Sequence, residues 1–356
     1  MYLLSLFLFL FSFSFSSNIQ VSNVIDYYAR SYIVMDYNSG KVIEEKNKDL
    51  VRSVASISKL MTAYVAINYC DNINDVVVIG DEIDNAYGSA VYIQKGEELT
   101  LKELLYALLL RSGNDAALSI ASFIGQGDIS FFVSMMNQEA RKIGMHNSLF
   151  RNPCGLDEED GGNLSSSYEI ALLMRKCLDI PLFCEIVSST NYQSSNHGVW
   201  HNKNKLINQY KFTTGGKTGF TRLAKRTLVT SAKKENTHLI VVTLDCGSDF
   251  AFHKYLYEKN FNIYENRLLL QRGNKRIENY VVKVDYDINV ILKKEEWDNT
   301  LLIYKLENNN KEMDIYLIYD NEEIYLSSLD IIEIHKDTIK LSFWDRLINF
   351  LRNIFK

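Results

Sequence analysis

The chain has 356 residues, 47% hydrophobic and 23% charged, so it is long enough for one large domain with a smaller one and has a globular composition. Its 39 basic and 44 acidic residues give a net charge of −5, which argues against a nucleic-acid binder that must neutralise phosphates. The five cysteines are scattered and the six histidines form no ligand-type cluster. We therefore expect mostly buried thiols and neither a metal nor another cofactor.

The N-terminal residues 1–17 are an almost unbroken run of leucine and phenylalanine that ends in small polar residues. The apolar core has the length of a secretory signal and is too short to span a bilayer comfortably. Cleavage near Ser16 or Ser17 would release an exported protein. Because no lysine or arginine precedes the run, an uncleaved anchor is the alternative.

A hairpin and a nucleophile-type motif follow. The strand-like runs 32–37 and 41–45 are joined by a turn sequence, which predicts an antiparallel pair. Next, Ser56-Ile57-Ser58-Lys59 precedes an apolar run. A helix that begins near Ser56 places its hydroxyl one turn from the Lys59 ammonium. A lysine accepts a serine proton only when burial or another cation lowers its pKa, so the motif predicts a second lysine nearby.

Further elements are predicted from capping residues and hydrophobic periodicity. The helices are expected at 100–110, 115–121, 129–143, 166–178 and 250–264. The strand-like runs 226–232 and 238–244 predict a second hairpin. An irregular stretch at 152–157 has the composition of a functional or shaping loop.

The chain beyond residue 272 differs from the first part. Helix signals vanish, and strand-like runs recur at 280–284, 288–292, 313–319 and 331–334. Short strands with polar turns predict a small all-β domain over 272–338.

The last segment, Leu341-Lys356, is amphipathic. Bulky apolar residues fall on one helical stripe, and the charged and amide residues fall on the other. Such a helix fits the plane of a membrane surface, so we predict membrane association through this segment. Packing on its own domain is the alternative.

Three short motifs occur in order: Ser56-Ile57-Ser58-Lys59, Ser112-Gly113-Asn114 and Lys217-Thr218-Gly219. Together they match a known set that surrounds an acyl-enzyme site, and Lys217 supplies the second lysine. We expect Gly219 to let a substrate backbone approach the strand edge closely. Taken singly, Ser112 could cap the next helix, Asn114 could fix a turn and Lys217 could be a solvated charge.

With these motifs and their flanks, residues 32–264 resemble the serine-type D-alanyl-D-alanine carboxypeptidases, which are low-molecular-mass penicillin-binding proteins. The stretch Asn152-Pro153-Cys154-Gly155-Leu156-Asp157 resembles the family's Asn-Pro-x-Gly-Leu loop. The resemblance implies an α+β fold, with a β-lactamase/transpeptidase-like domain over 20–268 made of an antiparallel sheet and a helical subdomain. The small all-β domain and the C-terminal amphipathic helix would follow.

The resemblance also implies roles for individual residues. Ser56 would attack the carbonyl between two D-alanines, Lys59 would accept its proton, and Ser112 would relay a proton to the leaving amine. The substrate-binding residues would be Asn114, Lys217, Thr218, Gly219 and Phe220. The N–H groups of Ser56 and Phe220 would hold the oxyanion. Lys217 and Thr218 would meet the terminal carboxylate, and Lys217 would help to keep Lys59 neutral.

The implied activity is removal of the terminal D-alanine from peptidoglycan stem peptides that end in D-Ala-D-Ala, at the extracellular face of the membrane or in the cell wall. β-Lactam antibiotics would acylate the same serine. The chain departs from the family at Ala224-Lys225, where Ala-Gly is common. It also lacks the downstream arginine that assists carboxylate recognition in some members, and offers only His253 or Lys254 there.

Three other functions compete with this interpretation. A class A β-lactamase would need a glutamate that activates water, for which Asp157, Glu158 and Glu159 are the acidic candidates. A non-catalytic wall-binding protein could retain the fold. Transpeptidase or endopeptidase activity on the same peptides is the nearest rival.

Overall fold

The computed structural model describes residues 28–84, 86–157, 161–320 and 322–334. The predicted signal segment 1–17 and the amphipathic segment Leu341-Lys356 lie outside the described residues. The first domain is built on a five-stranded antiparallel sheet with the order β2-β1-β11-β10-β9. Its strands are β1 Ala29–Asp36, β2 Val42–Lys46, β9 Thr213–Thr221, β10 Lys225–Lys234 and β11 Thr237–Cys246. Both predicted hairpins are therefore confirmed.

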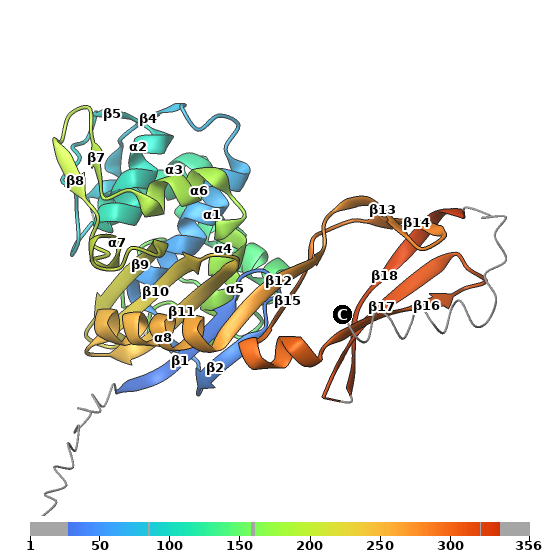
Figure 1. Cartoon of the computed structure of the whole chain (residues 1–356). Coiled ribbons are helices and arrows are strands. Elements are labelled where there is room, and N and C mark those ends of the chain that lie inside the picture. The colour runs from blue at the N-terminus through green and yellow to red at the C-terminus, as the bar shows by residue number, and fades with distance from the viewer. Residues whose placement is uncertain (1–27, 85, 158–160, 321, 335–356) are drawn as a thin grey trace, which may run out of the picture.

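Helices cover both faces of this sheet (Figure 1). In β11, Ile240 and Val242 belong to the core shared with the helical subdomain, whereas Leu239 and Val241 belong to the core under α8. Alternate side chains thus enter opposite cores, because successive residues of a strand point to opposite faces. This explains why the central strands are apolar without alternation.

The helical subdomain follows β2 in the chain and lies on one face of the sheet (Figure 1). Its helices are α1 Lys59–Tyr69, α2 Leu101–Tyr106, α3 Asn114–Ile124, α4 Ile129–Ile143, α5 Ser167–Leu178 and α6 Pro181–Ser188. Helix α8, Asp249–Ile263, packs on the opposite face, and α7 is the short turn Leu206–Gln209. The predicted caps are present: the Thr100 capping box opens α2, Ser166 caps α5 and Gly144 closes α4.

Some elements differ from the predictions. The first helix opens with a 3-10 turn, Ala55–Ser58, and the expected helix 100–110 is α2 followed by a π-helical turn, Ala107–Arg111. Strand β9 and helix α6 were not predicted. The short strands are β3 Arg52–Ser53, β4 Val76–Val78, β5 Glu98–Thr100, β6 Leu164–Ser165, β7 Asn191–Gln193 and β8 Val199–His201.

The second domain is all-β, as predicted. Strand β12, Tyr264–Leu270, follows α8 and pairs with β15, Ile288–Lys293, as a two-stranded ribbon (Figure 1). A five-stranded sheet has the order β13-β14-β18-β17-β16. Its strands are β13 Gly273–Ile277, β14 Tyr280–Val284, β16 Leu301–Glu307, β17 Glu312–Tyr319 and β18 Glu322–Ile334. β12 begins within the range predicted for the first domain and runs two residues past its end, and the boundary at 268–272 stays a prediction.

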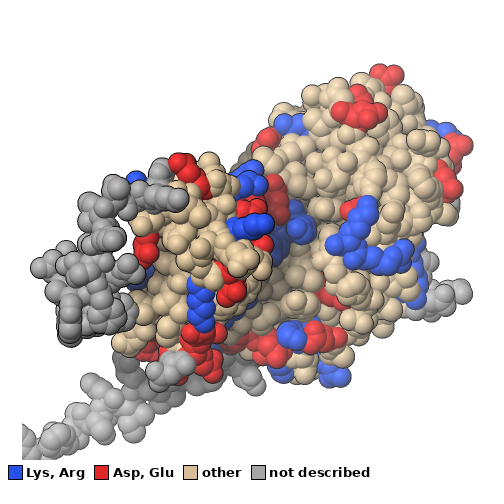
Figure 2. All heavy atoms as spheres, turned by 90° about the vertical axis from the view of Figure 1, so that its right-hand side faces the viewer, with Lys and Arg blue, Asp and Glu red and all other residues tan. Residues whose placement is uncertain are grey.

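Surface charge and thiol burial agree with a globular protein. Basic and acidic side chains are interspersed on the face shown in Figure 2. Cys154, Cys177 and Cys246 are buried, which confirms that most of the thiols act as small core residues. Within the described ranges no single helix is long and apolar enough to cross a membrane, although the bent pair α3 and α4, 89° apart, reaches that length and composition together.

Candidate active site

The first motif lies where the 3-10 turn Ala55–Ser58 runs into α1. Ala55 has a φ of +52°, an unfavourable left-handed conformation for a residue with a side chain. The Lys59 side chain is fully buried, and its Nζ donates to Ser56 Oγ at 3.2 Å and to Asn114 Oδ1 at 2.7 Å. The Cys154 carbonyl is its third acceptor. The structure thus brings the serine and the lysine into direct contact.

Burial is the main cause that lowers the pKa of Lys59, from its ordinary 10.5 to about 8. Cys154 and Asp115 raise this pKa, and the positive charge of Lys203 lowers it further. The lowered pKa makes the neutral form of Lys59, which can accept a proton, more accessible near neutral pH. Lys203 was not singled out from the sequence. It is half-buried on the segment after β8, and its Nζ donates to Ser89 Oγ at 3.1 Å.

The second motif lies between the π-helical turn and α3. Ser112 is 4% exposed and has a φ of +63°. The N-cap residue of α3 is Gly113, and no side chain caps this helix. The alternative that Ser112 caps the next helix is therefore wrong. Asn114 Nδ2 donates to the Tyr87 carbonyl at 2.5 Å, which leaves Asn114 Oδ1 facing Lys59.

The third motif lies on β9, at the edge of the sheet. Lys217 is 1% exposed, which excludes a solvated charge, and its Nζ donates to Ser112 Oγ at 3.0 Å and to the Thr218 carbonyl at 2.8 Å. Burial is the first cause that holds the pKa of Lys217 well below its ordinary value, and the charge of Lys59 is the second. Thr218 is partly exposed, and Phe220 is 65% exposed. The three motifs therefore meet in one cluster, in which Lys59 bonds Ser56 and Asn114 while Lys217 bonds Ser112.

Gly219 packs closely against two neighbouring segments of the chain. A Cβ at this position would lie 2.4 Å from Thr227 Oγ1 and 3.0 Å from the backbone nitrogens of Ser56 and Ile57. Glycine is needed here because β9 packs directly against the turn that carries Ser56. The expected approach of a substrate backbone to Gly219 stays a prediction.

The loop 152–157 shapes the floor of the site. Asn152 Oδ1 accepts the N–H groups of Cys154 at 3.1 Å, Gly155 at 2.7 Å and Leu156 at 3.2 Å. Gly155 has a φ of +74°, and a Cβ there would lie 2.2 Å from the Ala55 carbonyl oxygen. The loop is thereby folded so that the Cys154 carbonyl reaches Lys59.

The two candidates for the missing arginine lie away from the cluster. His253 is fully buried between α8 and the sheet, where its ring nitrogens bond Thr230 Oγ1 at 2.8 Å and Thr243 Oγ1 at 2.9 Å. Burial lowers the pKa of His253 to about 3, so its ring is neutral. Lys254, on α8, lies 3.8 Å from Glu258. His253 therefore has no route to a substrate carboxylate.

Asp157 and Lys225 are the remaining predicted positions that the structure describes. Asp157 accepts from Ser53 Oγ and from the Leu223 N–H, both at 3.3 Å. Glu158 and Glu159 lie outside the described residues. Lys225, where the family commonly has glycine, has a φ of +61° and so occupies the left-handed conformation that glycine adopts at no cost.

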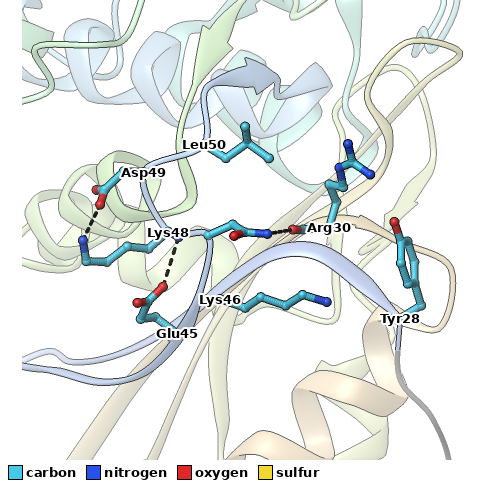
Figure 3. A pocket seen from close by; sticks show the side chains of 8 residues that line it. Tyr28, Arg30, Glu45, Lys46, Lys48, Asp49 and Leu50 are labelled. Carbon is cyan, nitrogen blue, oxygen red and sulfur yellow. Dashed lines mark hydrogen bonds and ion pairs between the residues drawn. The ribbon is translucent and has the colours of Figure 1, made fainter.

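A pocket of about 630 Å³ lies elsewhere, at the ends of β1 and β2 (Figure 3). Arg30, Lys46 and Lys48 line it, together with Glu45 and Asp49. None of the predicted site residues belongs to it. Among the described residues, no group of three or more His, Cys, Asp or Glu side chains is placed to hold a metal ion.

Comparison with known proteins defines the class first. Penicillin-binding protein 5 from Haemophilus influenzae has the same fold over 86% of this chain and 97% of its own, with a TM-score of 0.76 and 24% identity. A D-alanyl-D-alanine carboxypeptidase from Mycobacterium tuberculosis is similar over 66% of this chain and 92% of its own, with a TM-score of 0.63 and 28% identity. The fold is that of the penicillin-binding proteins and DD-peptidases.

The sequence comparison identifies the family. Residues 18–248 match the family model of the D-alanyl-D-alanine carboxypeptidases, and the chain belongs to this family. The D-alanyl-D-alanine carboxypeptidase DacF of Bacillus subtilis is 33% identical over 256 residues. That match covers 65% of this chain and 65% of the length of the Bacillus protein.

Proposed function

We propose that this protein is an exported serine D-alanyl-D-alanine carboxypeptidase, which removes the terminal D-alanine from peptidoglycan stem pentapeptides through a Ser56 acyl-enzyme and is acylated by penicillins. The observation that carries the proposal is the 3.2 Å contact between Ser56 Oγ and a fully buried Lys59, whose pKa is lowered to about 8. A serine becomes a nucleophile when an adjacent base takes its proton, and burial makes this lysine such a base.

The chemistry would proceed in two steps. Ser56 Oγ attacks the carbonyl carbon between the two D-alanines while Lys59 accepts the hydroxyl proton. Ser112 passes a proton to the leaving amine, free D-alanine departs, and water then hydrolyses the ester to release the shortened peptide. The contact from Lys217 Nζ to Ser112 Oγ supports the relay, since a hydroxyl held by a lysine is oriented for proton transfer.

Two further parts of the site would bind the substrate. The close packing of Gly219 on the backbone nitrogens of Ser56 and Ile57 supports an oxyanion site formed by the N–H groups of Ser56 and Phe220. Lys217 and Thr218 would receive the terminal carboxylate, whose charge would raise the pKa of Lys217 and favour its cationic form. Asn114 would bond the substrate's peptide group as well as Lys59.

Intact mass spectrometry of the purified full chain after incubation with penicillin tests the proposal. We expect one covalent adduct, lost in Ser56→Ala and retained in Ser134→Ala, a control at an exposed serine of α4. The absence of an adduct, or an adduct that survives Ser56→Ala, would refute the acyl-enzyme. Release of D-alanine from a pentapeptide ending in D-Ala-D-Ala separates a carboxypeptidase from a non-catalytic wall-binding protein.

The same assays distinguish a carboxypeptidase from a β-lactamase and from a transpeptidase. Rapid turnover of penicillin without release of alanine would favour a β-lactamase, and transfer of the acyl group to an added amine would favour a transpeptidase.

We also propose that Leu341-Lys356 binds the membrane surface. Liposome flotation of the chain with and without this segment tests that proposal, and equal flotation contradicts it.

A further inference from the structure

Asp115 is a buried carboxylate beside Asn114 that the proposed chemistry does not use. It is 3% exposed, at the first turn of α3. Its oxygens accept four backbone N–H groups, those of Val91, Tyr92, Ile93 and Ala116. The shortest bond, from Tyr92, is 2.7 Å. Within the described part of the chain no Lys, Arg or His forms an ion pair with Asp115, so backbone dipoles stabilise its charge.

Three of these N–H groups are consecutive, and they set the shape of the loop 87–93. Successive N–H groups can point to one carboxylate only if the backbone bends sharply between them. Tyr92 takes a φ of +64°, a left-handed conformation that is unfavourable for a residue with a side chain. The bonds to Asp115 hold the loop in this conformation.

The other end of the loop touches Asn114 directly. The Ser89 carbonyl accepts the Asn114 backbone N–H at 2.7 Å, and the Tyr87 carbonyl accepts Asn114 Nδ2. Between them Gly88 has a φ of +83°, and a Cβ there would lie 3.2 Å from Asn114 Nδ2. The loop therefore packs closely against the side chain that contacts Lys59.

This contact decides which way the Asn114 amide is turned. An asparagine carries a donor and an acceptor at nearly the same positions, so its orientation is set by the partners around it. Because the Tyr87 carbonyl takes the Nδ2 donor, Oδ1 is left to accept from Lys59 Nζ at 2.7 Å. The loop thereby keeps Nδ2 turned away from the lysine.

We propose that Asp115 is a positioning residue for acylation: it anchors the loop 87–93, the loop turns the Asn114 amide, and the amide places Lys59 against Ser56. The inference rests on the proposed function, since it assigns Asp115 to the reaction of the same site. Asp115 touches no reacting atom and acts only through Asn114 and Lys59.

The charge of Asp115 also affects the pKa of Lys59, and hence the pH dependence of acylation. Asp115 and Cys154 raise the pKa of Lys59, and the charge of Lys203 lowers it. The charge of Lys59 in turn lowers the pKa of Lys217. Asp115→Asn removes a negative charge that raises the pKa of Lys59. By releasing the loop 87–93 it also weakens the hydrogen bond that Asn114 Oδ1 accepts from the Lys59 ammonium. Both changes lower that pKa, so the acidic limb of the pH–rate profile moves to lower pH.

The test measures the rate constant for acylation of the full chain by penicillin as a function of pH, using intact mass. For Asp115→Asn we expect a plateau rate lower by about tenfold or more, since displacement of a catalytic group by about 1 Å can cost up to about a hundredfold. We also expect an acidic limb at lower pH. Asp71→Asn, which removes one exposed carboxylate beyond α1, is the matched control and should leave both unchanged.

Two outcomes would overturn the inference. An unchanged rate excludes any positioning role, and a lower rate with an unmoved limb shows that Asp115 is merely structural. If Asp115→Asn does not fold, Gly88→Ala takes its place, because its Cβ pushes the loop away from Asn114; a wild-type rate and limb in Gly88→Ala then overturn the inference. Absence of a wild-type adduct refutes the proposed function instead, so the two failures are distinct.

Discussion

Replacing Gly219 by alanine tests whether the packing of β9 on the turn Ala55–Ser58 controls the proposed reaction. The new Cβ would lie 2.4 Å from Thr227 Oγ1, whereas ordinary contacts begin at 3.4 Å. Either the Thr227 side chain or the strand must therefore shift by about 1 Å, the difference between these distances, and the backbone nitrogens of Ser56 and Ile57, 3.0 Å from the new Cβ, must also give by a few tenths of an ångström. Such overpacking costs about 1–3 kcal/mol of stability. If β9 moves by about 1 Å against Ser56, the Phe220 N–H that we propose as an oxyanion donor is displaced, and the rate falls by up to about a hundredfold.

The assay follows acylation of Gly219→Ala by penicillin, together with its thermal unfolding. Gly247→Ala is the control, because a Cβ there meets no atom within 4 Å and the residue is exposed. We expect a folded protein with slow acylation for Gly219→Ala and wild-type behaviour for the control. Wild-type acylation by Gly219→Ala would refute the reasoning, since the strand would then tolerate the displacement.

Other predictions concern Lys59 and local stability. Lys203→Gln removes a positive charge that lowers the pKa of Lys59, so the acidic limb of acylation should move to higher pH, whereas the exposed control Lys205→Gln should leave it in place. Lys225→Gly relieves a left-handed φ of +61° and should raise the free energy of unfolding by about 1 kcal/mol in urea denaturation; an unchanged value would contradict this. Thr100→Ala removes a capping box and should lower that free energy by about 1 kcal/mol, with acylation unaffected.

The helices and the central hairpins could be predicted from the sequence because their signals are local. Thr100 and Ser166 cap the backbone three residues ahead, and Gly144 ends α4 in a left-handed conformation. Such contacts form within one helical turn and therefore depend on nearby residues alone. Strand β9 gave no such signal, because its threonines and glycines have no apolar alternation and it becomes a strand by pairing with β10.

In the candidate site, too, some features follow from the sequence and others only from the tertiary structure. The sequence by itself determined the three motifs, and hence which serines, lysines and asparagine could take part, because residue type and short spacing are written in the chain. Only the tertiary structure decided what surrounds them: the carbonyl of Cys154, the charges of Lys203 and Asp115, and the packing that requires Gly219. These partners are distant in sequence, and burial, which lowers the pKa of Lys59, exists only once the sheet and the helices close around it.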